Sequence, residues 1–350
     1  MLLRAAAVAA LAACGGSQPE PATTTRASVT APSSIAIAAP ATPPELSEAA
    51  LMAHVTRLAA EDLQGRRAGT VYEKRAAEYV ASELEAAKIP PPPGGKRFQT
   101  FALGGGAQSL NTYGFLRGGE PGLEREVVVL GAHVDHLGVT GGEIYRGAED
   151  NASGVAVVLE IAKSLAQSHR QGLGRSVVLA FFGGEELGMV GSTAFVSDPP
   201  VPLGDVIAMV NIDMIARPLV DQVALAIPKL ALHLDPARAV GVVGMKGRAG
   251  FRRIVGAACA ATGITPVGPE DFPAPISAIL EKETEARGDN WPFERAGIPA
   301  LFFGSGESDD YHQPTDVPET LVPAIMAARA RAILATVLAL SQADRSTIRR

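Results

Sequence analysis

The chain contains little cysteine, little histidine and few charged residues. Only two of its 350 residues are cysteine, and Cys14 and Cys259 lie in contexts too different to indicate a disulfide framework. Charged residues make up 19% of the sequence, and a formal net charge of −6 leaves no basic surplus. We therefore expect no nucleic-acid partner, because nucleic-acid-binding proteins carry clustered positive charge. With 47% hydrophobic residues, the chain can bury a large core.

The apolar run near the N-terminus is too short to span a bilayer. Arg4, the apolar residues 5–13 and the sequence Leu-Ala-Ala-Cys ending at Cys14 are typical of a bacterial lipoprotein signal peptide, although an ordinary alanine-rich terminus is the alternative. Residues 14–44 are rich in Pro, Ser, Thr and Ala, which predicts a disordered tether. We expect a signal peptide at 1–13 and a lipid anchor at Cys14. The anchor would place the protein on the periplasmic side of the outer membrane, since Gly15 and not Asp follows the cysteine.

Apolar runs alternate with helical patterns along the rest of the chain. We expect strands at 176–182, 206–212 and 298–303 and helices near 71–87, 153–166, 251–262 and 319–341. The strand runs are continuously hydrophobic, which indicates a parallel sheet covered on both faces. The prediction is an α/β protein with a single catalytic domain at 45–343 and a tail at 344–350. Apart from the expected helix near 251–262, the stretch 217–285 is in places irregular and rich in proline.

Carboxylate and imidazole side chains follow the apolar runs, at the points where strands are expected to end. These residues are His133, Asp135, Asp150, Glu185, Glu186, Asp213 and His312. In an open parallel sheet, residues just beyond the carboxyl ends of the strands converge on one crevice. Imidazole nitrogen and carboxylate oxygen are donors that zinc accepts, so the pattern predicts a metal site.

The spacing of these residues indicates how they divide the work. Side chains alternate along a strand, so Asp135 is expected on the same side as His133, where it can hold the second ring nitrogen. The adjacent anions Glu185 and Glu186 repel each other unless a cation or a proton intervenes. One of them can bind metal while the other accepts a proton from the attacking water.

Each residue also has a simpler explanation when it is taken alone. His133 could be structural, the glutamate pair could begin a helix, Asp213 could cap a loop and His312 could belong to a turn. We interpret His54, His136, His169 and His233 as structural or surface residues, and Cys259 as a small core hydrophobe. The simpler explanations fail jointly, because the candidate site residues form five groups that fall in order along the alternating strands. The groups are His133 with Asp135, Asp150, Glu185 with Glu186, Asp213 and His312.

The motifs around these residues resemble a known family. They are Gly65–Thr70, Gly131–Gly138, Gly147–Gly154, Gly184–Ser192, Asn211–Met214 and Asp310–Asp316. Together they are similar to the co-catalytic di-zinc aminopeptidases, family twenty-eight of the metallopeptidases, over roughly residues 46–340. The resemblance implies a phosphorylase/hydrolase-like sandwich, with a mixed central sheet between helices, that releases N-terminal amino acids from peptides.

The resemblance also implies a role for each residue. His133, Asp150 and Asp213 would bind one zinc ion, and Asp150, Glu186 and His312 would bind a second. Glu185 would be the general base, Asp135 would orient His133, and the Asp150–Asn151 peptide bond would be cis.

Some features leave alternatives open. Gly288-Asp289-Asn290 stands where relatives often carry Ser-Asp-His, so we expect altered pocket contacts and retained metals. A carboxypeptidase or dipeptidase of the same fold, a single-zinc glutaminyl cyclase and a non-catalytic binding lipoprotein remain as other functions.

Overall fold

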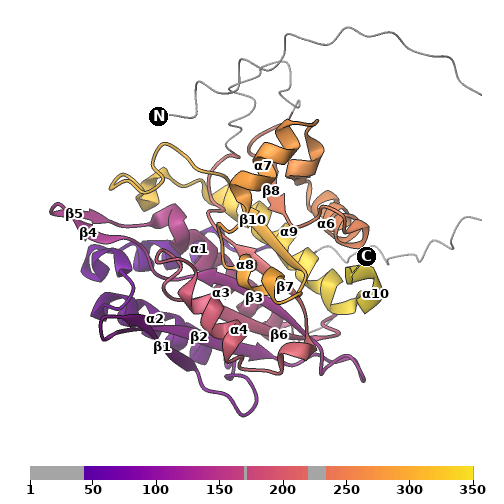
Figure 1. The fold of residues 1–350 in the computed structure, drawn as a ribbon, viewed down its shortest axis with the longest axis horizontal. Helices are drawn as coiled ribbons and strands as arrows, with labels where there is room; N and C mark the ends of the chain where they lie inside the picture. The colour runs from indigo at the N-terminus through magenta and orange to yellow at the C-terminus, as the bar shows by residue number, and fades with distance from the viewer. Residues whose placement is uncertain (1–42, 169–171, 220–233, 350) are drawn as a thin grey trace, which may run out of the picture. The chain divides into compact units, whose positions relative to one another are not determined.

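A mixed eight-stranded sheet crosses the part of the chain that the structure describes, residues 43–168, 172–219 and 234–349 of a computed structural model (Figure 1). All of these residues belong to one compact unit. In spatial order the strands are β1 (Phe98–Gly104), β2 (Ala107–Leu116), β6 (Ser176–Phe182), β3 (Val127–His133), β7 (Val206–Ile212), β10 (Ala300–Gly304), β8 (Ala239–Val243) and β9 (Thr265–Val267).

The four central strands β6, β3, β7 and β10 run parallel to one another. The flanking strands make the sheet mixed, because β2 is antiparallel to β6 and β8 is antiparallel to β10. Every residue of β3, β6 and β7 is buried, which explains their continuous hydrophobic sequences. The predicted strands at 176–182 and 206–212 are confirmed at their full length.

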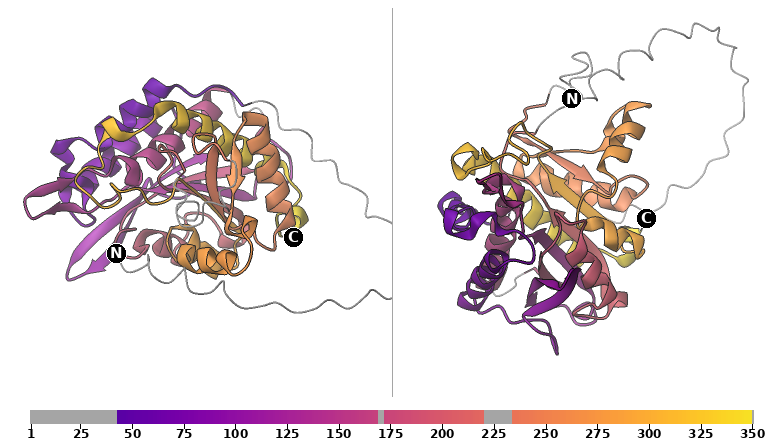
Figure 2. Two further views of the ribbon diagram at one scale, coloured as in Figure 1. Left: turned by 90° about the horizontal axis from the view of Figure 1, so that it is seen from above. Right: turned by 60° about the vertical axis from the view of Figure 1, so that its left-hand side comes forward.

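Helices cover both faces of the sheet (Figure 2). One face is covered by α1 (Glu48–Leu58), α2 (Val71–Ala86), α3 (Gly154–Gln167), α6 (Ala249–Thr262) and α9 (Pro323–Gln342), and the other by α4 (Val190–Ser197) and α8 (Asn290–Arg295). Phe182 of β6 packs against α4 and α8, with its ring centroid 6.1 Å from that of Phe195 and 6.2 Å from that of Phe293. Helix α9 is apolar enough to cross a membrane by composition, but most of it is buried in this core.

Several short elements come from stretches without a clear sequence pattern. Strands β8 and β9 and helix α7 (Ile276–Thr284) arise within 217–285, which the sequence indicates only as irregular. Strands β4 (Gly138–Thr140) and β5 (Glu143–Tyr145) form a separate hairpin. Residues of the expected tail form α10 (Arg345–Arg349), whose Ile348 is fully buried. Elements this short give only a weak periodic signal in the sequence, so they are recognised only in the tertiary structure.

Short helical turns connect the larger elements. They are η1 (Glu61–Arg66), η2 (Ala148–Ser153), η3 (Leu203–Asp205), η5 (Pro269–Asp271) and η6 (Pro318–Thr320). The expected signal peptide at 1–13, with Cys14, lies outside the described residues, as do His169, His233 and most of the tether.

Candidate metal centre

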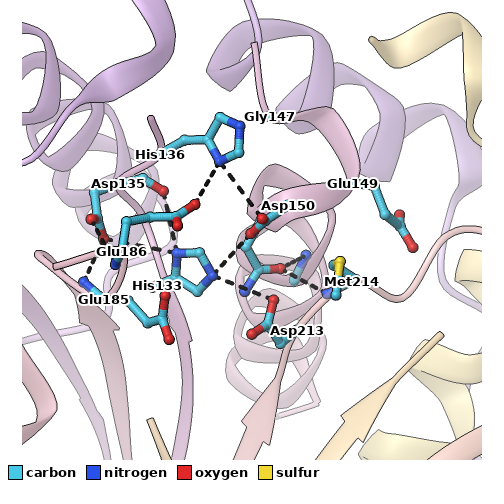
Figure 3. A network of polar contacts seen from close by, with 12 residues as sticks. His133, Asp135, His136, Gly147, Glu149, Asp150, Glu185, Glu186, Asp213 and Met214 are labelled. Carbon is cyan, nitrogen blue, oxygen red and sulfur yellow. Dashed lines mark hydrogen bonds and ion pairs between the residues drawn. The ribbon is translucent and has the colours of Figure 1, made fainter. Parts of the chain in front are cut away.

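The carboxyl ends of the parallel strands bring the predicted ligands to one edge of the sheet (Figure 3). His133 is the last residue of β3, and Asp213 follows the last residue of β7. Glu185 and Glu186 lie just after β6, whose Phe182 pairs with His133 in the parallel ladder. Matched strand ends therefore place side chains from distant parts of the sequence side by side.

Asp150 occupies the centre of this group. Its Oδ1 lies 3.2 Å from Nε2 of His133, and its Oδ2 lies 3.2 Å from Nε2 of His312. The backbone around it is fixed by Asp316, whose carboxylate accepts the N–H groups of Glu149 and Asp150 at 2.9 and 3.1 Å. The Asp150–Asn151 peptide bond is cis, as predicted. The two oxygens of one carboxylate thus face two different histidines.

The first ligand set consists of His133, Asp150 and Asp213, all of them buried. Oδ1 of Asp213 lies 3.3 Å from Nε2 of His133, close to the 3.2 Å separation of that nitrogen from Asp150. Zinc bonds of about 2.0–2.1 Å in a tetrahedral site place neighbouring donor atoms about 3.3–3.4 Å apart. The spacing and the donor types of this set therefore fit a zinc ion.

The second ligand set consists of Asp150, Glu186 and His312. Nε2 of His312 lies 3.2 Å from Oδ2 of Asp150 and 3.2 Å from Oε2 of Glu186, the same spacing as in the first set. Within the described part of the chain this nitrogen makes no well-formed hydrogen bond, as expected of an atom placed to bind metal. The side chain of His312 is 34% exposed, so this end of the site opens to solvent.

His136 also belongs to the site, although its sequence context suggests a structural or surface role. It is buried, and its Nδ1 lies 2.8 Å from Oε1 of Glu186 and 3.8 Å from Oδ2 of Asp150. These three side chains form a group that is compact enough to hold a metal ion. The signal in the sequence is that His136 directly follows Asp135, which continues the run of site residues begun by His133.

Asp135 makes different contacts from those expected. Its carboxylate lies 3.8 Å from Nδ1 of His133, beyond hydrogen-bonding distance, and Nδ1 is instead 3.2 Å from the Asp135 backbone carbonyl. The carboxylate accepts the backbone N–H groups of Glu185 and Glu186 at 3.0 and 3.3 Å. Asp135 therefore fixes the turn after β6, a contact that strand alternation within β3 does not reveal.

The adjacent glutamates have opposite electrostatic environments. Burial raises the pKa of Glu185 well above its ordinary value, despite the lowering effect of His133. For Glu186, burial and the charge of Asp150 also raise the pKa, but contacts with His136 and His312 outweigh them and lower it. Glu185 is thus suited to take up a proton, while Glu186 stays ionised.

Burial and charged neighbours also affect His312 and two further acids, Glu149 and Asp289. Burial lowers the pKa of His312, but its contacts with Asp150 and Glu186 raise it to about 10. Glu149 points away from the histidines (Figure 3) and accepts the N–H groups of Ala216 and Arg217. The fully buried Asp289 has its pKa raised by burial to about 7. Neither acid follows an apolar run directly, so the pattern of strand ends predicts no role for either of them.

A family model described as Peptidase family M28 matches residues 111–337, a region that includes every predicted ligand. The chain belongs to peptidase family M28. A protein named leupeptin-inactivating enzyme 1, from Streptomyces exfoliatus, is 35% identical over 196 residues, which cover 55% of this chain and 41% of that protein. A probable lipoprotein aminopeptidase LpqL, from Mycobacterium tuberculosis, is 34% identical over 120 residues, or 34% of this chain and 23% of that one. The chain thus spans less than half the length of these curated relatives.

Solved structures share the M28 fold at lower identity. BSAP, a zinc aminopeptidase from Bacillus subtilis, superposes with a TM-score of 0.61 at 15% identity, covering 86% of this chain and 97% of that chain. A glutaminyl cyclase from Porphyromonas gingivalis gives a TM-score of 0.58 at 19% identity, covering 84% and 99%. One architecture therefore occurs in proteins with different names, and the residues of the site determine which reaction each one supports.

Proposed function

We propose that this M28 protein is a zinc-dependent aminopeptidase, which hydrolyses the peptide bond after the N-terminal residue of a peptide. The observation that carries the proposal is the position of Asp150, whose two carboxylate oxygens each lie 3.2 Å from a different histidine. A carboxylate shared in this way is typical of a site for two metal ions. The family match and the relatives named as aminopeptidases support the same reaction.

Two zinc ions are the metals that best suit these donors. His133, Asp150 and Asp213 would hold one ion, and Asp150, Glu186 and His312 the other, with His136 beside Glu186. Zinc bound there would lower the pKa of the attacking water and stabilise the negative charge that develops on the substrate carbonyl. Imidazole donors in both sets disfavour magnesium and calcium, which prefer oxygen ligands.

Glu185 is the general base in this proposal. Its pKa is raised by burial, and it carries none of the close histidine contacts that occupy Glu186. It would accept a proton from the attacking water and deliver it to the leaving amine. Asp135 would hold Glu185 in place through the backbone N–H group that its carboxylate accepts.

The substrates in this proposal are peptides with a free N-terminus. Site carboxylates that hold no metal would be available to bind a protonated α-amine, and the relatives named as aminopeptidases support this substrate class. A single-zinc glutaminyl cyclase has a similar fold, but it would need only one of the two ligand sets.

The experiment that tests this function compares three substrate types. We expect the purified protein to hydrolyse aminoacyl-p-nitroanilides and to leave N-blocked analogues and C-terminal reporter peptides intact. A chelator should abolish the activity, and zinc should restore it. Cleavage of the N-blocked or C-terminal reporters at a comparable rate would contradict the proposal, and cyclisation of an N-terminal glutamine without peptide hydrolysis would favour the cyclase.

We also propose that Cys14 is lipidated and anchors the enzyme on the periplasmic side of a bacterial outer membrane. The Leu-Ala-Ala-Cys sequence and the likeness to the mycobacterial protein named as a lipoprotein support this attachment. Cys14→Ser should move the protein from the membrane to the soluble fraction of lysed cells. Unchanged membrane association of the variant would rule out the lipid anchor.

A further inference from the structure

Arg66 is a buried cation that the proposed reaction does not yet use. It belongs to the Gly65–Thr70 motif, and only 1% of its surface is exposed. No carboxylate of the described residues lies within ion-pairing distance of its guanidinium group. Burying an arginine without a direct counter-ion is costly, so its hydrogen bonds need an explanation.

Among the described residues, the guanidinium group of Arg66 donates to backbone carbonyl groups only. Its Nε donates to Val134 at 2.9 Å, and its Nη2 donates to Gly147 at 3.0 Å. Its Nη1 donates to Leu58 at 2.8 Å and to Arg146 at 2.6 Å. Val134 lies between His133 and Asp135, and Gly147 shortly precedes Asp150. One planar side chain therefore ties together the segment that carries His133 and the segment that carries the shared carboxylate of Asp150.

The backbone around Arg66 fits against the same two segments. Gly65 has a positive φ of 67°, and a Cβ atom there would lie 2.3 Å from the Tyr145 carbonyl oxygen. Only glycine avoids this clash. The backbone carbonyl of Arg66 accepts the N–H group of His136 at 3.4 Å. Gly65 and Arg66 thus lie buried between the end of β3 and the segment that leads into η2.

The charge of Arg66 acts on the carboxylates of the site. Burial lowers the pKa of Arg66 to about 10, while the charges of Asp150, Asp135 and further acids oppose this shift, so the group stays protonated at neutral pH. Before metal binds, the ligand carboxylates repel one another. A fixed cation beneath them offsets part of this repulsion without occupying a ligand position.

We propose that Arg66 is a positioning residue of the metal centre, which holds residues 133–136 and 147–150 at the spacing that zinc requires before zinc binds. The proposal rests on the proposed zinc-dependent function. The guanidinium fork is essential to it, because four carbonyl oxygens from separate segments are reached by one rigid group. A lysine would keep the charge but could not make the same set of hydrogen bonds.

The test compares Arg66→Lys with Arg175→Lys. Arg175 is also buried and donates to the carbonyls of Ser341 and Ala343. It directly precedes β6, so it lies at the amino ends of the parallel strands, away from the metal centre at their carboxyl ends. Zinc affinity is measured by competition with a chromophoric chelator, and unfolding of the metal-free proteins by urea. We expect Arg66→Lys to bind zinc about 10–100-fold more weakly, as is typical when support for metal ligands is lost. At saturating zinc its kcat should fall with little change in KM.

The control variant separates this role from a general loss of stability. Arg175→Lys should also unfold at lower urea concentration, but it should keep the zinc affinity and kcat of the wild type. If Arg66→Lys behaves like this control, Arg66 is only structural and the proposal is wrong. If Arg66→Lys does not fold, Arg66→Gln is tested by the rise in Tm that zinc causes, and a rise equal to that of the wild type would overturn the proposal.

The remaining outcomes are also decisive. If neither Arg66 variant folds while Arg175→Lys does, the residue is required for the fold and not specifically for the metal site, which overturns the proposal. A wild-type protein that binds no zinc would instead refute the proposed function, so the two failures are distinguishable.

Discussion

Replacing each of the adjacent glutamates by glutamine tests the division of roles between them. Glu185→Gln removes the proton-accepting group but no atom of either ligand set, so both metals should remain bound. Loss of a general base typically slows a reaction about 10²–10⁴-fold, which corresponds to about 3–5 kcal/mol in the activation barrier. Glu186→Gln should instead weaken one metal site, since Oε2 of Glu186 lies 3.2 Å from Nε2 of His312.

The assay is metal stoichiometry measured beside turnover of an aminoacyl-p-nitroanilide for both variants. Glu185→Gln should retain two zinc ions per chain and stay slow at any zinc concentration. Glu186→Gln should lose part of its zinc on dialysis and regain part of its activity when zinc is added in excess. Asp205→Asn, at a half-buried acid in η3, provides a charge-matched control and should leave both quantities unchanged.

Two results would refute this reasoning. If Glu185→Gln loses a metal while Glu186→Gln retains two, the roles of the two residues are reversed. If neither substitution slows hydrolysis, the general-base mechanism and the ligand assignment are both wrong.

Three further predictions concern the support of the site. Burial raises the pKa of Glu73 from 4.5 to about 8, so its contribution to stability is present below pH 4.5 and is lost as the pH rises through 8. In urea unfolding of the metal-free proteins, Glu73→Gln should therefore lose less stability than the wild type over this pH range. An unchanged pH profile of stability in the variant would contradict the raised pKa of Glu73. Phe195→Ala should lower the free energy of unfolding by about 3–5 kcal/mol, because the ring is fully buried among other aromatic rings; a loss under about 1 kcal/mol in urea unfolding would show that the core repacks. Asp316→Asn should weaken zinc binding about tenfold in chelator competition, because the carboxylate fixes the backbone of Asp150 in the shared position, and wild-type affinity would argue against this role.

Three of the ligands could be predicted because each one lies at the end of a strand whose sequence is unambiguous. Strands β3, β6 and β7 are buried on both faces, so their sequences are continuously hydrophobic and their ends are clear. His133, Glu186 and Asp213 stand at or just beyond those ends. The parallel arrangement of neighbouring strands then suffices to predict that these side chains meet.

The supporting residues could not be predicted in the same way. Arg66, Glu149 and Asp316 act through hydrogen bonds to or from backbone groups far away in the sequence, and no periodicity marks such contacts. The sequence predicts only a structural or surface role for His136, because a single histidine gives no indication of which side chains it contacts. Its contact with Glu186 exists only because β6 lies next to β3.

The amino-acid sequence by itself determined the family, the alternation of strands and helices, and the residues that stand at the strand ends, because hydrophobic runs and short motifs are local properties of the chain. Only the tertiary structure decided which atoms face one another. It placed the two oxygens of Asp150 toward His133 and His312, and it turned the carboxylate of Asp135 to the backbone of Glu185. Such contacts depend on the register of neighbouring strands and on loops fixed by distant partners, and these are set only when the whole sheet is assembled.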